Sequence, residues 1–531
     1  MKKNVLALSI AAMIGGLGFA GAASAALSVA DSGTGHILLV PYYTAQNDNM
    51  SVLHVVNTDT THGKAVKVRF RGAANSDDVL DFQLFLSPGD VWTAAVTKGE
   101  DGRAQLTTSD NSCTLPTVKG AAVPFVTARL NQANDAATLA NNTREGYVEI
   151  LNMGDIDNAA TYTVGGVANK NSALYTATKH VNGVAPCTDS VLQGTLAWDN
   201  TTAAATSGLL APTGGLLGSW YVINVPQTTV YSGADTAITS SNPITATTAF
   251  SPQSNATGAA STLYTADPLF RTGVLTLQGY DVPDLSTPID LDYATPEAQA
   301  SALTLAIAHT SVINQYATDS DVSLKTDWLL SQPTRRYSIA ANYLATVTTG
   351  TATVAGAAGA KGTASSAEVG GTITYGGTAT GLSGATGAYR VANSDVSNSP
   401  TAAGTVFYSA GNTSVSNGLI CLSSIGQNFR DREESVHTSG AVFSPGNVSN
   451  LPLCGEVNVL SFASGSVLGA SVASSTVNSA AAYTNGWGQV NFTAPGVPLL
   501  GSAFFKATNP LVSTGVSGTY GITWPHAYVT P

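Results

Sequence analysis

The sequence predicts a mainly β protein built on an antiparallel β-sandwich. Three observations lead to this prediction. Short apolar segments alternate with polar residues at a period of two, which is typical of half-buried strands. Clusters of turn-forming residues separate those segments. Charged residues make up only 10% of the 531 residues, so Ser, Thr, Gly, Ala and Asn supply most of the polarity. The expected core is immunoglobulin-like, with long loop insertions.

The clearest strand signals lie between Ser51 and Val96. Apolar and basic side chains alternate in residues 64–71, and apolar and polar ones alternate in residues 80–86. Ser87-Pro88-Gly89-Asp90 then places Pro and Gly where a type II turn requires them. Consecutive short strands with short connections indicate an antiparallel meander, which forms one sheet of the sandwich.

The basic side chains of the first segment form a stripe along one strand. Its members are Lys64, Lys67, Arg69 and Arg71. We expect this stripe to be a solvated strand face. The alternative is a strip that binds a polyanion such as lipopolysaccharide or capsule.

One short helix is expected near residues 295–316. Thr295 suits the N-cap and Pro296 suits the first helical position. An approximate helical stripe follows, formed by Leu303, Ile307, Val312 and Tyr316.

The chain divides into four regions by composition. Residues 1–25 resemble a signal peptide, with Lys2 and Lys3 before a short apolar run and a small-residue cleavage site at Ala23-Ser24-Ala25. Residues 26–345 are expected to hold the N-terminal sandwich region and the helix. Residues 346–404 are rich in Gly, Thr, Ala and Ser and are expected to be an inserted β-module. Strands in residues 405–531 are expected to complete the sandwich.

The four cysteines fit an oxidising compartment. Cys113, Cys187, Cys421 and Cys454 allow three pairings, and their spacings do not fit a zinc site. We favour Cys113–Cys187 and Cys421–Cys454, because each bridge closes a local loop. With the predicted signal peptide, these cysteines indicate a secreted protein, and no second apolar run is long enough for a membrane helix.

The formal charge of −11 argues against nucleic-acid binding, which depends on basic side chains that neutralise phosphates. Acidic pairs in expected loops suggest weak calcium candidates instead. They are Asp155, Asp157, Asp319 and Asp321. None has the spacing of an EF-hand, so calcium is an expectation without a defined ligand set.

The sequence shows no catalytic motif, and we expect the protein not to be an enzyme. No Gly-x-Ser-x-Gly motif occurs. Glu433, Glu434 and Glu456 could serve a glycosidase only if folding set two of them roughly 5–9 Å apart in a cleft. An extracellular hydrolase is therefore the least favoured hypothesis.

Several segments resemble a family of secreted proteobacterial cell-surface and surface-layer-like proteins. The resemblance covers most of the chain, outside 346–404, and its motifs read as strand and turn residues. They include Leu39-Val40-Pro41-Tyr42-Tyr43, Val55-Val56-Asn57-Thr58, Thr326-Asp327-Trp328, Pro333-Thr334-Arg335-Arg336-Tyr337 and Leu453-Cys454-Gly455-Glu456-Val457. The resemblance implies an exported, β-rich protein of a Gram-negative cell surface, with no activity to carry over.

The leading hypothesis is a structural protein that self-associates into a surface layer or similar extracellular coat. The alternative is a secreted adhesin or carbohydrate-binding protein. Trp198, Trp220 and Trp487 are candidates for stacking on sugar rings in that case, although a tryptophan is more often buried in the core.

Overall fold

The computed structural model describes most of the chain between residues 27 and 531. The described residues are 27–127, 130–131, 134–157, 162–164, 167–169, 172–195, 208–241, 280–281, 302–320, 323–335, 339–342, 350–354, 371–375, 388–391, 412–433, 450–462, 465–472, 474–477, 484–509 and 518–531. The predicted signal peptide, the start of the predicted helix, Asp321, Glu434 and Trp198 lie outside them.

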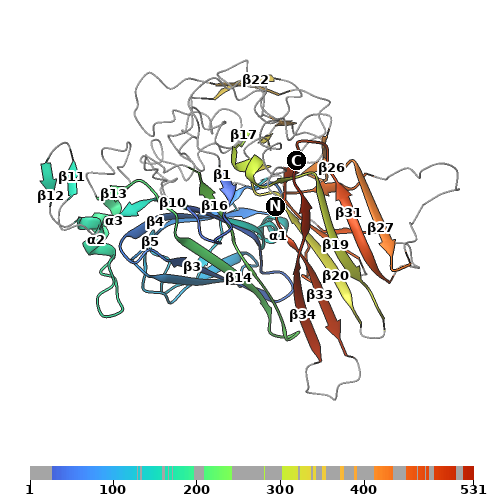
Figure 1. Ribbon diagram of the computed structural model, residues 1–531, viewed down its shortest axis with the longest axis horizontal. Coiled ribbons are helices and arrows are strands. Elements are labelled where there is room, and N and C mark those ends of the chain that lie inside the picture. The colour runs from blue at the N-terminus through green and yellow to red at the C-terminus, as the bar shows by residue number, and fades with distance from the viewer. Residues whose placement is uncertain are drawn as a thin grey trace, which may run out of the picture.

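The N-terminal half forms a sandwich of two sheets, as Figure 1 shows in blue and green. The eight-stranded sheet contains, in order, β1 (Leu27–Val29), β16 (Thr236–Ser240), β2 (Ile37–Thr44), β10 (Glu145–Ile156), β4 (Gly63–Gly72), β5 (Asp78–Leu86) and β8 (Cys113–Leu115), with β13 (Leu209–Leu210) beside β10. The six-stranded sheet contains β15 (Thr229–Ala234), β14 (Leu216–Asn224), β3 (Asn49–Asn57), β6 (Val91–Lys98), β7 (Ala104–Thr107) and β9 (Val123–Pro124).

The two sheets differ in how many of their faces are covered. In β3 buried and half-buried residues alternate, so one face packs on the core and the other faces outward. Every residue of β4, β5 and β10 is buried, so these strands are covered on both faces. One face packs against the six-stranded sheet. Apolar residues of α2 (Ala173–Thr178), α3 (Asp189–Gly194) and the helical turn at 302–306 pack against the other.

The C-terminal half forms a second sandwich, coloured yellow to red in Figure 1. Its four-stranded sheet contains β27 (Gly426–Asp431), β31 (Asn485–Asn491), β19 (Ser311–Ala317) and β35 (Ala527–Val529). Its five-stranded sheet contains β30 (Ser474–Thr476), β29 (Val457–Ser461), β20 (Lys325–Ser331), β33 (Ser502–Thr508) and β34 (Thr519–Pro525). An aromatic cluster fills its core, with Trp328 and Phe462 rings 5.0 Å apart between centroids.

Smaller elements complete the described structure. These are α1 (Ala136–Asn142), β11 (Tyr162–Val164), β12 (Val167–Asn169), β17 (Tyr280–Asp281), β18 (Ala308–His309), β21 (Ile339–Asn342), β22 (Gly350–Val354), β23 (Gly371–Tyr375), β24 (Ala388–Val391), β25 (Thr413–Ser416), β26 (Leu419–Ser423), β28 (Pro452–Cys454) and β32 (Val497–Pro498). Strands β22, β23 and β24 lie in the segment for which an inserted β-module was predicted.

Mainly antiparallel β structure is as predicted, but two details differ. Residues 405–531 do not complete the first sandwich. Their strands pair with β19 and β20 instead, so a second pair of sheets forms. The predicted helix is also too long, because residues 302–306 are helical but 311–317 form strand β19. Val312 and Tyr316 are four residues apart, a spacing that places both on one face of a strand as well as of a helix.

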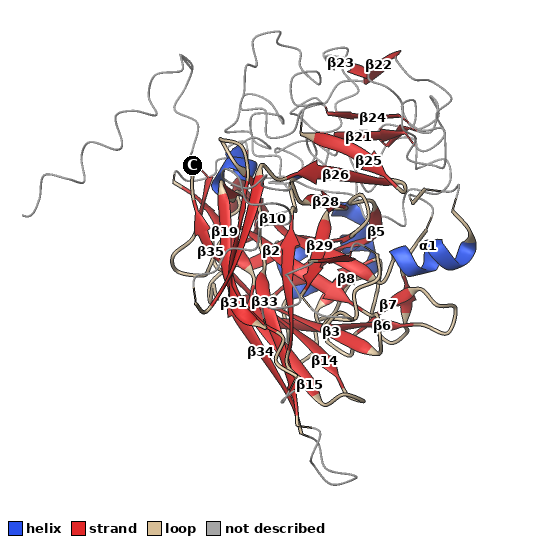
Figure 2. Cartoon of the chain, turned by 90° about the vertical axis from the view of Figure 1, so that its right-hand side faces the viewer, coloured by secondary structure: helices blue, strands red, loops and turns tan. Residues whose placement is uncertain are grey.

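The two sandwiches share a continuous core, and the view in Figure 2 shows the sheets of both. Phe504 of β33 packs with Trp220 and Tyr231 of the first sandwich, at ring-centroid distances of 6.1 and 5.3 Å. Polar contacts follow the same junction. The Glu456 N–H donates to the Ala73 carbonyl at 2.7 Å, and the Asn49 amide donates to the Leu468 carbonyl at 2.6 Å.

Candidate functional site

The basic stripe is buried between carboxylates, so both sequence-based interpretations of it are wrong. Lys67 Nζ lies 2.7 Å from Asp81 Oδ1, and Arg71 Nε lies 3.1 Å from Glu149 Oε2. Arg69 lies between Asp78 and Glu149 in the same cluster. These strands are covered on both faces, and buried charges require opposite charges beside them. The stripe is therefore neither a solvated face nor an accessible surface for lipopolysaccharide.

Burial perturbs the ionisation of the most enclosed pair of this cluster. Loss of solvation lowers the pKa of the Lys67 amino group and raises the pKa of the Asp81 carboxyl group. Each shift disfavours the charged form, and the attraction between the partners opposes it. The Lys67–Asp81 pair links β4 to β5, and Glu149 of the adjacent cluster links β10 to β4.

Among the described residues, no group of three possible metal ligands contains more than one of the calcium candidates. Asp155 accepts hydrogen bonds from Lys64 Nζ at 2.7 Å and Asn152 Nδ2 at 2.9 Å. Asp59, His62 and Asp155 do place one ligand atom each within 4.8 Å of one another. However, the Lys64 ammonium group lies beside both carboxylates, 3.8 Å from Asp59 Oδ2. A lysine already supplies the positive charge that a bound cation would bring.

The remaining acidic candidates are dispersed. Asp157 is buried and donates its N–H to the Gly208 carbonyl, whereas Asp319 is only half-buried. Glu456 forms a buried ion pair at 2.6 Å with Arg335 Nε, and Glu433 is exposed. Glu456 and Glu433 thus lie in very different environments. The geometry offers no support for the glycosidase hypothesis among these residues.

The four cysteines form two disulfides in the favoured pairing. Cys113 is bonded to Cys187, and Cys421 is bonded to Cys454. The first bridge attaches α2 and its following loop to β8 in the first sandwich. The second joins β26 to β28 at opposite positions in the strand register. Both bridges thus fasten peripheral segments to the sandwiches.

Of the candidate tryptophans, only one is accessible among those described. Trp220 is buried in the core, whereas Trp487 on β31 is exposed, with the Arg430 guanidinium 5.8 Å from its ring centroid. Trp524 is more exposed and was not singled out from the sequence. Its period-two spacing from Tyr520 and Ile522 was the available signal.

These three residues form an apolar ladder on a protruding hairpin. Tyr520, Ile522 and Trp524 are 65%, 52% and 55% exposed. They lie on one face of β34, directly opposite Ala507, Phe505 and Ala503 of β33. In Figure 1 the β33–β34 hairpin extends beyond the rest of its sandwich. β35 spans only three residues and pairs with β19 at 311–313, so this face of the hairpin stays largely uncovered.

The opposite face of the hairpin is packed against the first sandwich. A Cβ atom built on Gly521 would lie 2.7 Å from the Val230 carbonyl oxygen of β15. The Ser232 N–H donates to Thr523 Oγ1 at 3.2 Å. Gly521 therefore permits a close approach that another residue would prevent. This packing holds the apolar ladder in place, directed away from β15.

The outer face of the six-stranded sheet is a second uncovered surface. Strand register aligns Leu217, Val56 and Val91 in one row and Tyr221, Val52 and Ala95 in another. A further row contains Ile223, Met50 and Val230. No carboxylate or ammonium group stands in these rows.

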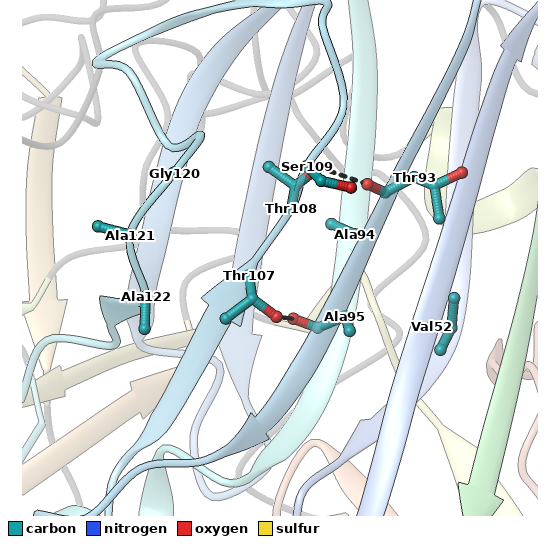
Figure 3. A pocket seen from close by; sticks show the side chains of 10 residues that line it. All are labelled: Val52, Thr93, Ala94, Ala95, Thr107, Thr108, Ser109, Gly120, Ala121 and Ala122. Carbon is teal, nitrogen blue, oxygen red and sulfur yellow. Dashed lines mark hydrogen bonds between the residues drawn. The ribbon is translucent and has the colours of Figure 1, made fainter.

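Small side chains hollow one border of this face, as Figure 3 shows. The groove has a volume of about 530 Å³. It lies over β6 and β7, and its lining includes Thr93, Ala95, Thr108 and Ala122. The Thr108 hydroxyl donates to the Thr93 carbonyl at 2.6 Å, which leaves mainly methyl groups at the surface. We call the rows and this groove together the outer face.

A polar pocket of about 440 Å³ lies where the two sandwiches meet. Amide and hydroxyl side chains dominate its lining, with one carboxylate and no basic side chain. The lining residues are Ala74, Asn75, Asp77, Asn131, Asn134, Thr138, Asn141, Asn142, Ser416, Asn417, Gly418, Leu419, Cys454, Ser471, Val472, Ser474 and Ser475. Such a surface suits an uncharged, hydroxyl-rich ligand better than an anion or an apolar molecule.

A buried glutamate stabilises the junction beside this pocket. Glu145 accepts hydrogen bonds from the N–H groups of Ser471 and Val472, at 2.8 and 2.9 Å. Burial raises its pKa to about 7, although the two N–H donors favour the carboxylate. Asp327 also has a raised pKa because of burial. It accepts from the Leu468 N–H at 3.0 Å.

Comparisons with protein-family models, with curated proteins and with solved structures find no match for this chain. The resemblance to cell-surface proteins therefore stays a prediction. Within the described residues, every helix is too short or too polar to cross a lipid bilayer. The class that the structure defines is a disulfide-containing, mainly β protein with two sandwich units.

Proposed function

We propose that this chain is an exported structural protein of the cell surface that self-associates into a layer or similar coat. The apolar ladder of the β33–β34 hairpin carries the proposal. Three large apolar side chains stand exposed on a hairpin whose other face is held by the same molecule. Exposed contiguous apolar surface commonly marks a site of protein–protein contact.

The composition supports association between copies. The chain carries few charged residues, and several of these form ion pairs in the buried cluster around Glu149. The outer face offers a second, uncharged contact surface. Mutual repulsion between such surfaces is small, and burying them releases structured water. Two separate contact surfaces on one molecule are what an extended array requires.

The disulfides support an extracellular location. Bonded cysteines persist in oxidising compartments and are rare in a reducing cytosol. The proposed location is the surface of a Gram-negative bacterium, and the resemblance described above is the ground for that choice.

The test combines imaging with sedimentation. Electron cryo-microscopy of intact cells should show a periodic coat that disappears when the gene is deleted. Purified residues 26–531 should form species larger than a monomer in sedimentation velocity as concentration rises. An unchanged envelope together with a monomer at high concentration would refute the proposal.

A second candidate function, binding of a neutral carbohydrate, is favoured by the polar pocket. Amide and hydroxyl groups match sugar hydroxyls in hydrogen-bonding capacity. Saturation-transfer NMR with a panel of neutral disaccharides tests it. Asn142→Ala in the lining should abolish a transfer signal that Asn485→Ala, on β31, retains. A panel without any signal would remove this candidate.

A further inference from the structure

Strand β34 lies at the edge of its sheet and also carries the apolar ladder. It ends the five-stranded sheet, and β33 is its only partner among the described strands. The Asn509 N–H donates to the Gly518 carbonyl at 2.9 Å, which marks that opposed pair as hydrogen-bonded. The pattern alternates along an antiparallel pair. Hence the backbone N–H and C=O groups of Gly521 and Thr523 point away from β33.

Other features of β34 fit an exposed edge. Pro525 has no N–H to leave unsatisfied at that edge, and proline is tolerated at such positions. The strand carries no charged residue, and charge is a common means of preventing edge-to-edge pairing. An uncharged and apolar edge strand is a template for the addition of another strand.

We propose that β34 pairs with β34 of a second copy, antiparallel, about a two-fold axis through Ile522. This inference rests on the proposed self-association and names its contact. In that register Ile522 stands opposite Ile522 of the second copy, and Tyr520 stands opposite Trp524. The sheet then continues from one molecule into the next.

The strand register favours a second copy of this chain as the partner that pairs with the edge of β34. The backbone groups of Gly521 and Thr523 point outward. Gly521 of each copy therefore exchanges hydrogen bonds with Thr523 of the other copy. Ile522, Tyr520 and Trp524 then occupy the non-hydrogen-bonded pairs, where side chains approach most closely. Aromatic pairs flank a central aliphatic pair, a favourable cross-strand arrangement. The strand is thus complementary to itself.

Asn314 of β19 contacts the C-terminal end of β34, where its Nδ2 donates to the Trp524 and Pro525 carbonyls at 3.3 and 3.2 Å. β15 contacts the opposite face of the hairpin through Val230 and Ser232. That contact fixes β34 before association, so little conformational entropy is lost when the edges pair. The outer face of the six-stranded sheet remains free for a different contact between dimers.

Cysteine cross-linking tests the register directly. All four native cysteines are in disulfides, so a new cysteine is the sole thiol. Opposed Cβ atoms in a non-hydrogen-bonded pair lie about 4.5–5.5 Å apart, close to the reach of a disulfide. We expect Ile522→Cys to form a covalent dimer on mild oxidation. Tyr520→Cys alone should not, but should cross-link to Trp524→Cys when the two variants are mixed.

The exposed Ile425→Cys variant is the matched control, because Ile425 lies at a turn outside the hairpin. Equal cross-linking of Ile425→Cys and Ile522→Cys would indicate random collision and overturn the register. Cross-linking of Tyr520→Cys with itself would indicate a different register and overturn it too.

Sedimentation of Ile522→Lys separates this inference from the proposed function. Two lysines would face each other at the axis, and we expect the dimer dissociation constant to rise at least about tenfold. If Ile522→Lys assembles as the unaltered chain does, self-association stands but the β34 contact is wrong. If the unaltered chain stays monomeric at all concentrations, both proposals fail.

Discussion

Asp235 should make folding stability fall as pH rises, and replacing it with asparagine should remove that dependence. Asp235 lies between β15 and β16 with its side chain buried. No hydrogen bond reaches either carboxyl oxygen from the described residues. A Cβ built on Gly218 would lie 1.7 Å from Asp235 Oδ2, so glycine is required there to make room for the carboxyl group. Burial raises its pKa from 3.8 to about 8.

The sign and size of the stability change caused by Asp235 follow from proton linkage. The folded chain holds this proton at pH values where the unfolded chain has released it, so stability is lost between about pH 3.8 and 8. Each unit of pKa difference corresponds to about 1.4 kcal/mol. The loss from Asp235 is therefore roughly 4 kcal/mol at pH 7 and increases by roughly 3–4 kcal/mol between pH 5 and pH 8.

Denaturant unfolding of Asp235→Asn and of the unaltered chain at pH 5, 6, 7 and 8 measures this effect. We expect the free energy of unfolding of Asp235→Asn to exceed that of the unaltered chain by an amount that grows with pH. The exposed Asp31→Asn is the control, because water surrounds that carboxyl in the folded and the unfolded chain. A difference between Asp235→Asn and the unaltered chain that stays constant from pH 5 to pH 8 would refute the reasoning.

Three further variants test other buried interactions. Lys64→Met leaves Asp155 as an uncompensated buried charge, and denaturant titration should show a loss of about 3–5 kcal/mol. Glu145→Gln replaces one acceptor oxygen by a donor, so thermal unfolding should reveal a loss of about 1–3 kcal/mol at pH 8. That loss should be larger at pH 5 than at pH 8. The folded chain keeps the Glu145 proton up to about pH 7, whereas the unfolded chain releases it near pH 4.5, so the unaltered chain loses stability between these two pH values. Combining Cys113→Ser with Cys187→Ser opens a loop with a sequence separation of 74 and should cost about 4 kcal/mol in the same assay; an unchanged midpoint would contradict this.

Local sequence pattern predicts the strands well but not their surroundings. The alternation in residues 64–71 correctly indicates strand β4, because backbone geometry alone sets a period of two. The same pattern also suggested that Lys67 and Arg69 face solvent. They are buried beside carboxylates. Asp81 of β5 and Glu149 of β10 stand opposite Arg69, and Asp81 also lies 2.7 Å from Lys67. These partners belong to other strands, and the pattern within residues 64–71 does not reveal them.

The prediction of a helix over residues 295–316 is partly wrong for a related reason. Val312 and Tyr316 fit either a helix or a strand, and pairing with β31 decides between the two. That partner strand lies more than 150 residues further along the chain. The same distance hid the second sandwich, whose β19 and β20 precede most of their partners by more than 100 residues.

The apolar ladder shows which functional signal the sequence did contain. Tyr520, Ile522 and Trp524 alternate with Thr519, Gly521 and Thr523, as in any half-buried strand. Sequence alone would assign the larger side chains to the core. The structure reverses this, because Gly521 and Thr523 are the residues that fit against β15. Small residues face the molecule and large ones face outward. That inversion favours a partner for the large residues, and the self-complementary order of the strand favours a second copy as that partner.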